Sequence, residues 1–293
     1  MRRGIVLSPE KEPITRNACA KINLTFEVLG KRRDGYHEIV SVMQAISLCD
    51  VLTFKPHEDI RLACDVADLV SPNNLVAKAA RRMQGLAHGD HGVSISLSKG
   101  IPLASGLGGG SSDAAMTLQA LNEMWDMVLP HERLMEVAAQ LGSDVPFFVG
   151  GSRTALATGR GEKVEPLPSP AKTWVVLLRP PMGMPNKTRE MYAHLDPAGF
   201  TKGQHARRLA NSIKKGGRVT SHQCFNVFDQ LGLSLFPGLD HYRREFLAAG
   251  ASEVHLAGAG PTLFTLVEGR NEGEAILGRL RKQRMEAYLA ETL

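Results

Sequence analysis

Apolar and polar residues alternate with a period of two over residues 20–28, and this pattern predicts a half-buried β-strand. Lys21 and Asn23 emerge side by side on the polar face of this strand. The opposite face carries Ala20, Ile22, Leu24, Phe26 and Val28. A lysine on a strand face is most often a solvated surface residue, so the pattern alone leaves the role of Lys21 open.

Similar patterns predict further elements along the chain. Apolar runs predict strands at residues 39–54, 60–64, 93–97, 174–178 and 253–256. Helical spacing predicts helices at residues 74–84, 114–125 and 132–141. A proline-rich stretch at residues 166–170 is typical of a linker. The chain is therefore expected to mix strands and helices in two domains, residues 1–168 and residues 169–293.

A glycine-rich loop connects the strand at 93–97 to the helix at 114–125. It reads Pro102, Leu103, Ala104, Ser105, Gly106, Leu107, Gly108, Gly109, Gly110, Ser111 and Ser112. Its glycines permit positive φ and remove Cβ atoms, so backbone N–H groups can converge on an anion. A helix N-terminus behind such a loop suits phosphate, with Ser111 or Ser112 as candidate caps. A flexible linker or a tight turn is the alternative interpretation.

Two common nucleotide motifs do not match this loop. A Walker-type loop ends in Gly-Lys-Ser/Thr, and no lysine follows these glycines. The dinucleotide fingerprint needs a third glycine where Ser111 stands. The loop is therefore a candidate phosphate site of another kind.

Residues 33–37 form a predicted turn, in which Asp34-Gly35 supplies the bend. The turn presents Tyr36 and His37 together. A tyrosine ring can stack on a base, and an imidazole nitrogen can hydrogen-bond to a pyrimidine edge. A hairpin tip with a packed tyrosine is the alternative.

Asp144 stands between small residues and an apolar run, at the boundary of an element. Such an aspartate is usually a helix N-cap. A carboxylate in this place can also act as a general base, and the local pattern does not separate the two roles.

Composition narrows the class of protein. The chain of 293 residues is 43% hydrophobic and 22% charged, and no apolar run approaches the ~20 residues that span a bilayer. The first 16 residues lack the apolar core of a signal peptide, so we expect a short tail on a cytoplasmic protein without membrane contact. The net charge of +5 is spread out, which favours a polyanionic small substrate over nucleic acid. In particular, the basic residues between 202 and 218 are expected to lie on a solvated helix face and a loop.

The four cysteines are Cys19, Cys49, Cys64 and Cys224. They are scattered, with no Cys-x-x-Cys pair, which argues against a zinc site and a disulfide framework. We therefore expect buried thiols.

The run Pro-x-x-x-Gly-Leu-Gly-Gly-Gly-Ser-Ser-Asp-Ala-Ala resembles the ATP loop of the galactokinase, homoserine kinase, mevalonate kinase and phosphomevalonate kinase (GHMP) superfamily. Residues 141–148, Leu-Gly-Ser-Asp-Val-Pro-Phe-Phe, are similar to its catalytic segment, and residues 257–264 are similar to its last motif. The resemblance covers nearly the whole chain. It implies an α+β fold with an N-terminal domain like the second domain of ribosomal protein S5, a ferredoxin-like C-terminal domain, and the active site between them.

The resemblance also implies roles for residues. ATP would lie on the loop from Pro102 to Ser112, and Asp144 would act as base beside Lys21. The Gly-Tyr-His segment resembles one branch of the superfamily, whose small-molecule substrate carries cytidine, so Asn23, Tyr36 and His37 would bind that substrate. Ser111 or Ser112 could offer a hydroxyl to the phosphates or to Mg²⁺. No acidic ligand for Mg²⁺ is clear from the spacing, so ATP and water are expected to hold it largely. Asp113 is expected to point away from the triphosphate.

The sequence departs from the family in two places. The connection at residues 184–188 is about two residues longer than usual, which puts base contacts from Thr188 or Tyr192 in doubt. Ala259 replaces a commoner serine. A kinase for another alcohol and a nucleotide-binding module without catalysis remain as alternatives, and a monomer or weak homodimer is expected.

Overall fold

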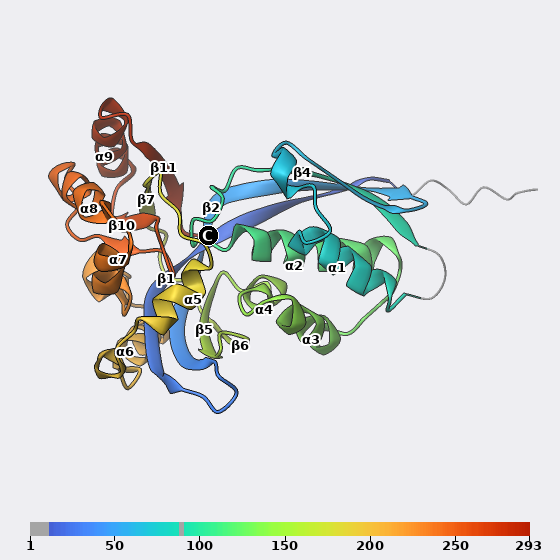
Figure 1. Cartoon of the computed structure of the whole chain (residues 1–293), viewed down its shortest axis with the longest axis horizontal. Helices are drawn as coiled ribbons and strands as arrows, with labels where there is room; N and C mark the ends of the chain where they lie inside the picture. The colour runs from blue at the N-terminus through green and yellow to red at the C-terminus, as the bar shows by residue number, and fades with distance from the viewer. Residues whose placement is uncertain (1–11, 88–90) are drawn as a thin grey trace, which may run out of the picture.

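The computed structural model describes residues 12–87 and 91–293, and these form two β-sheets with helices packed on them (Figure 1). The predicted α+β fold is confirmed. Most of the tail expected at residues 1–16 lies outside the described residues. Its last part was predicted wrongly, because the first strand already begins at Ile14.

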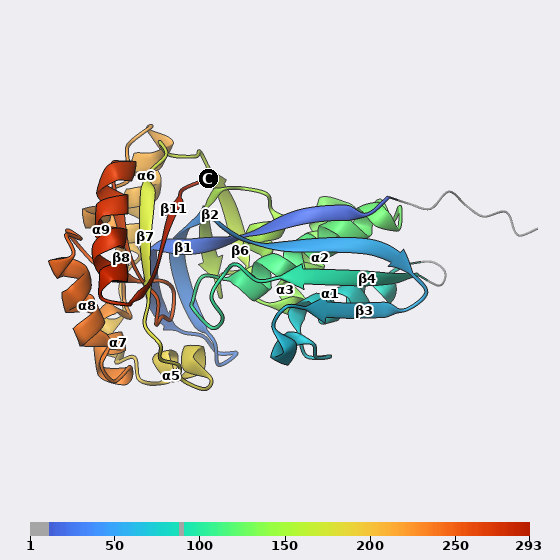
Figure 2. The ribbon, with the colours of Figure 1, turned by 90° about the horizontal axis from the view of Figure 1, so that it is seen from above.

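The larger sheet has seven strands in the order β3-β4-β2-β1-β8, with β5 paired to β2 and β6 to β5. Strands β1 and β2 form a long antiparallel hairpin, and Figure 2 shows β4 and β3 beside it. The strands are β1 (Ile14–Lys31), β2 (His37–His57), β3 (Ile60–Cys64), β4 (Gly92–Ser98), β5 (Thr154–Gly159), β6 (Lys163–Leu167) and β8 (Phe225–Asn226).

Four helices cover one face of this sheet: α1 (Leu75–Gln84), α2 (Gly109–Met124), α3 (His131–Leu141) and α4 (Val145–Val149). Their apolar residues form one core with β2 and β4, which includes Phe54, Ile95 and Leu118. Helix α1 begins where Asn74 accepts a hydrogen bond from the amide of Val76 at 2.9 Å. This core supports α2, whose N-terminus carries the glycine loop.

Strand β1 is buried on both faces over most of residues 20–28. Its apolar face, with Ile22 and Leu24, packs in a second core against α6 (Gln204–Lys214) and the smaller sheet. The surface interpretation of Lys21 was therefore wrong, since Lys21 and Asn23 are buried. Alternation identified which side chains share a face, but a strand inside the sheet need not expose either face.

The smaller sheet has the antiparallel order β11-β7-β10-β9 and lies at the left in Figure 1. Helices pack on it around Phe246, Ile276 and Leu280. The elements here are β7 (Trp174–Arg179), α5 (Lys187–Ala193), α7 (Asp229–Leu235), α8 (Leu239–Ala248), β9 (His255–Leu256), β10 (Leu263–Val267), α9 (Arg270–Lys282) and β11 (Glu286–Glu291). Short 3₁₀ turns lie at Ala67–Leu69, Pro197–Gly199 and Ser221–Gln223. The predicted linker, residues 166–170, overlaps the last two residues of β6 and then leads to β7, which belongs to the other sheet.

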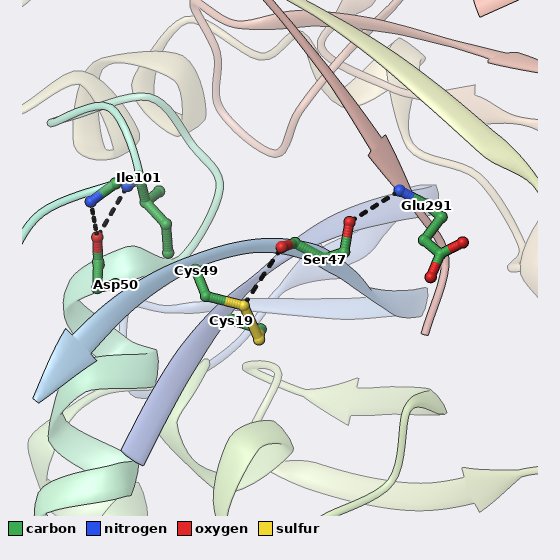
Figure 3. Close-up of a disulfide and its surroundings, with 7 residues drawn as sticks. Cys19, Ser47, Cys49, Asp50, Ile101 and Glu291 are labelled. Carbon is green, nitrogen blue, oxygen red and sulfur yellow. Dashed lines mark hydrogen bonds between the residues drawn. A yellow bond between two sulfur atoms is a disulfide. The ribbon is translucent and has the colours of Figure 1, made fainter. Parts of the chain in front are cut away.

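Cys19 and Cys49 form a disulfide between β1 and β2 (Figure 3), so the prediction of four thiols was wrong. The hairpin register places the two residues opposite each other, with Cα atoms 3.9 Å apart. A separation of 30 residues hid this pairing in the sequence. Cys64 and Cys224 are free thiols, and burial raises the pKa of both.

A buried ionic cluster lies beside this disulfide, under the start of the glycine loop. The ammonium of Lys99 contacts both Asp50 and Asp113, at 2.8 Å from the latter. Asp50 also accepts the amides of Gly100 and Ile101 at 2.8 Å each, as Figure 3 shows for Ile101. The cluster fixes the path of the chain into the loop.

The basic stretch behaves as predicted: Lys202, Arg207, Arg208, Lys214, Lys215 and Arg218 are exposed on and around α6. Among the helices of the described residues, none is long and apolar enough to cross a membrane.

Candidate active site

A cleft of about 1390 Å³ is lined by side chains from both halves of the chain. Its walls are the β1–β2 hairpin, the glycine loop, residues 139–144, the β5–β6 turn and α5. The volume exceeds that of a usual single-ligand pocket, which is roughly 300–1,000 Å³, and so leaves room for two substrates.

The glycine loop has the backbone conformation of a phosphate site. Gly106 and Gly108 have φ values of +89° and +76°, and Ala104 has φ +51°. Helix α2 begins at Gly109, inside the loop and three or four residues before the start that a Ser111 or Ser112 cap implied. Its first N–H groups have no intrahelical partner, so they are available to an anion. The prediction that Ser111 or Ser112 caps the helix was wrong, since Gly108 is the N-cap.

A second glycine turn, residues 257–261, packs against the glycine loop. A Cβ atom on Gly106 would lie 2.1 Å from the carbonyl oxygen of Ala257. The amide of Thr262 donates to the carbonyl of Ser105 at 3.4 Å. No side chain fits between the two turns, which explains the glycine at position 106.

The other loop residues divide between core and cleft. Leu107 is buried, and its carbonyl accepts the Lys21 amide at 2.9 Å. Gly106, Gly108 and Ser111 line the cleft. The hydroxyl of Ser112 is buried and has no hydrogen-bond partner among the described residues. Away from the cleft lining, Pro102 and Gly109 are half-buried and Leu103, Ala104 and Gly110 exposed.

Lys21 and Asp144 meet in the cleft. The Lys21 Nζ lies 3.2 Å from Asp144 Oδ2 and donates to Asn23 Oδ1 at 2.8 Å. Asn23 in turn donates to the hydroxyl of Ser41 at 2.8 Å. The Lys21 side chain is 4% exposed, and that of Asp144 is 35% exposed. The cleft therefore opens onto the carboxylate, while the lysine is held behind it.

Asp144 occupies the N-cap position of α4, but its side chain makes no capping hydrogen bond. The N-cap interpretation therefore placed Asp144 correctly at the start of α4, but the side chain does not cap the helix. The carboxylate pairs with Lys21 instead, and is free to face a ligand.

The other end of the cleft is aromatic. Tyr36 is 56% exposed, and the guanidinium of Arg160 lies 4.8 Å from the centroid of its ring. The His37 ring stacks on Tyr192 at 4.7 Å and 15°. Burial, assisted by the charge of Lys31, lowers the pKa of His37, so its ring is neutral near pH 7. Tyr36 is not packed as in an ordinary hairpin tip, and it offers a free ring face.

The sequence put base contacts from Thr188 and Tyr192 in doubt, yet both residues line the cleft. Burial and the charge of Asp144 raise the pKa of the Tyr192 hydroxyl, which therefore stays protonated. The longer connection before α5 does not displace this helix from the site. Sequence reasoning also missed Arg160 and Lys187 as lining residues, although a Gly-Arg-Gly turn gave a weak signal for Arg160.

Asp113 points away from the cleft, as expected, and is buried against Lys99. Burial and the neighbouring Asp50 raise its pKa to about 7, although Lys99 opposes the shift. No group of three or more His, Cys, Asp or Glu side chains that could hold a metal occurs in the described part of the chain. Ser111 and Asp144 are among the oxygen-bearing side chains that line the cleft.

Comparisons with known proteins agree with this geometry. Residues 74–152 match the family described as GHMP kinases N terminal domain, and residues 204–286 match GHMP kinases C terminal. A 4-diphosphocytidyl-2-C-methyl-D-erythritol kinase of Dehalococcoides mccartyi is 46% identical over 96% of this chain and 98% of its own length. One from Pelotomaculum thermopropionicum is 41% identical, with 95% and 98% covered.

A solved structure gives the same result. The crystal structure of a 4-(cytidine 5'-diphospho)-2C-methyl-D-erythritol kinase matches with a TM-score of 0.81 and 32% identity, over 95% of this chain and 99% of that one. Both the fold and the sequence agree over nearly the full length. The chain belongs to the GHMP kinases, in the family of the 4-diphosphocytidyl-2-C-methyl-D-erythritol kinases.

Proposed function

We propose that this protein transfers the γ-phosphoryl group of ATP to the 2-hydroxyl of 4-diphosphocytidyl-2-C-methyl-D-erythritol, giving the 2-phosphate and ADP. This is a step of non-mevalonate isoprenoid precursor biosynthesis. The observation that carries the proposal is the position of the Lys21–Asp144 pair, in one cleft with the glycine loop and the Tyr36–His37 end.

The glycine loop is the donor site in this proposal. Phosphoryl transfer asks the protein mainly to position the phosphates and neutralise charge. The N–H groups at the start of α2, with the positive end of its dipole, would hold the β- and γ-phosphates. Mg²⁺ would be held mainly by ATP and water, with the Ser111 hydroxyl as a protein ligand, and would neutralise phosphate charge.

The Lys21–Asp144 pair performs the chemical step. An alcohol is a poor nucleophile at neutral pH, and a carboxylate within hydrogen-bond reach accepts its proton as the new O–P bond forms. The ammonium of Lys21 stabilises the Asp144 carboxylate and the charge that develops on the transferred group. Lys21 keeps an N–H beyond those used by Asp144 and Asn23, because an ammonium has three.

The aromatic end is the acceptor site. The exposed ring of Tyr36 would stack on the cytosine, and the His37 imidazole would hydrogen-bond to its edge. Asn23, held between Lys21 and Ser41, would help to orient the polyol.

We further propose that residues 1–168 and 169–293 are the two domains that meet at this cleft. The enzyme is proposed to work in the cytoplasm as a monomer or weak homodimer.

A coupled assay of ADP release tests this function. The protein is supplied with Mg-ATP and a panel of alcohols: 4-diphosphocytidyl-2-C-methyl-D-erythritol, 2-C-methyl-D-erythritol 4-phosphate, homoserine, mevalonate and galactose. We expect turnover with the first compound alone, and turnover at least ~10²-fold slower with Asp144→Asn as the control. Turnover with another alcohol would make the protein a different kinase, and turnover with none would leave a binding module.

A further inference from the structure

Lys187, the first residue of α5, joins the two glycine turns. Its ammonium donates to the carbonyl of Ala104 in the glycine loop at 2.5 Å, and also to the carbonyl of Gly260 in the second glycine turn. Gly260 O lies 3.0 Å from where a Cβ of Gly106 would stand. The ammonium is therefore at the place where the two turns close on each other.

The contacts of Lys187 do not neutralise its charge. In the described residues, 12–87 and 91–293, it forms no ion pair with Asp or Glu, and both acceptors are neutral carbonyls. The side chain is half-buried and lines the cleft that also contains Lys21 and Ser111. Partial burial of a cation without an anion has a cost in free energy, and an anion that entered the cleft would reduce that cost.

The charges around Lys187 also favour an anionic ligand in the cleft. Burial, followed by the cations Lys21 on β1 and Arg179 on β7, lowers the pKa of Lys187 to about 8. Lys21 and Lys187 both line the cleft and are close enough for the charge of one to lower the pKa of the other. Together they attract a ligand that carries several negative charges. A nucleotide polyphosphate has that charge density.

We propose that Lys187 is a phosphate-binding residue of the cleft, whose ammonium exchanges its carbonyl acceptors for an oxygen of a nucleotide polyphosphate chain. The inference deepens the proposed function and rests on it. The chain could be the triphosphate of ATP or the diphosphate that carries cytidine, and the experiment separates these sources. The position of Lys187 between the two glycine turns favours ATP.

Calorimetric titration of the full chain tests the proposal, with ATP and CDP as probes at about pH 7 and about pH 9. The variants are Lys187→Met, Lys187→Arg and, as a surface control, Lys202→Met. We expect Lys187→Met to weaken ATP binding ~10-fold, because a charge-assisted hydrogen bond is lost. Lys187→Arg should retain most of the affinity, and Lys202→Met all of it.

The pH dependence adds a second readout. Phosphate binding raises the pKa of Lys187 above its free value, so its contribution is fully present below about pH 8 and is lost as the pH rises further. Wild-type affinity for ATP should therefore fall between about pH 7 and about pH 9 more than that of Lys187→Arg, whose guanidinium stays charged.

Three outcomes decide between the interpretations. Weaker binding of CDP but not ATP would keep Lys187 as a phosphate ligand and move it to the acceptor. Unchanged binding of both probes, with a lower melting temperature, would overturn the proposal and leave Lys187 as a tie between two turns. Loss of ATP affinity in Lys187→Met, without wild-type turnover in the panel of alcohols, would overturn the proposed function but not this inference.

Discussion

Lys21 and Lys99 are both buried lysines that pair with carboxylates, but their surroundings differ. Lys99 is 7% exposed, between Asp50 at 0% and Asp113 at 4%, so this cluster is closed to solvent. Lys21 pairs with Asp144, which is 35% exposed to the cleft. The closed cluster holds the backbone at the start of the glycine loop, whereas the open pair can meet a ligand. Exposure of the partner, more than burial of the lysine, separates a structural ion pair from a functional one.

Lys99→Met should give the largest effect. It would leave two buried carboxylates without their cation, and breaking a buried ion pair costs about 3–5 kcal/mol. Chemical denaturation should show this loss in the free energy of unfolding, whereas Lys78→Met on the exposed face of α1 should change it little. A Lys99→Met protein as stable as the wild type would show that the cluster does not support the loop.

Asp144→Asn should do the reverse, with a large loss of rate and little loss of stability. It keeps the shape but removes the basicity, so we expect kcat to fall at least ~10²-fold, or about 2.7 kcal/mol, with little change in KM for ATP. Lys21→Met should match it, and the double variant should be scarcely worse than either. Near-normal kcat with a lower melting temperature would instead mean that Asp144 serves α4 and the base lies elsewhere.

Tyr36→Ala and His37→Ala extend the comparison to the aromatic end, where the loss should appear in binding. Removing one stacking partner costs about 1–3 kcal/mol by analogy with base–aromatic contacts. Titration with the cytidine-bearing substrate should show weaker binding while ATP affinity stays nearly unchanged. An equal loss of ATP affinity would contradict the assignment of these residues to the acceptor.

Asp113→Asn should be the one stabilising change, and its effect should depend on pH. The folded-state pKa of about 7 lies above the unfolded value, so this group favours folding at low pH and its contribution is lost as the pH rises through 7. The amide resembles the protonated acid, so the variant should equal the wild type only near pH 3. Its advantage in stability should grow as the pH rises from about 4 to about 7, and should be fully developed near pH 8. Melting curves near pH 3 and near pH 8 measure this, and a variant less stable at pH 8 would show that the Asp113 carboxylate is needed by Lys99.

Local patterns in the sequence predicted part of the geometry of the candidate site. The glycine run indicated a phosphate loop because positive φ and missing Cβ atoms are properties of single residues, and Gly106 and Gly108 have them. Alternation placed Lys21 beside Asn23, and the hydrogen bond between them confirms that they are neighbours. That the sequence segments of Lys21 and Asp144 belong to one site came from the family resemblance.

Other features depended on contacts between distant segments. The disulfide follows from the register of β1 against β2, and alternation within either strand does not reveal that register. The start of α2 at Gly109 is fixed by packing on Ile101 and Asp50, since a glycine run has low helix propensity. Lys187 reaches the glycine loop from 83 residues away, and its position follows from α5 lying against the cleft.

The hydrogen bonds behind Asp144 run in one direction. Lys21 donates to Asn23, Asn23 donates to Ser41, and the Ser41 hydroxyl gives its only proton to the carbonyl of Thr25 at 2.6 Å. Each member is already a donor toward the interior, and the series ends at a backbone oxygen that cannot pass a proton on. In the proposed mechanism, a proton that Asp144 takes from the alcohol therefore has no exit through β1. It must leave through the open side of the cleft, so each turnover ends with the release of a proton to solvent or to a departing product.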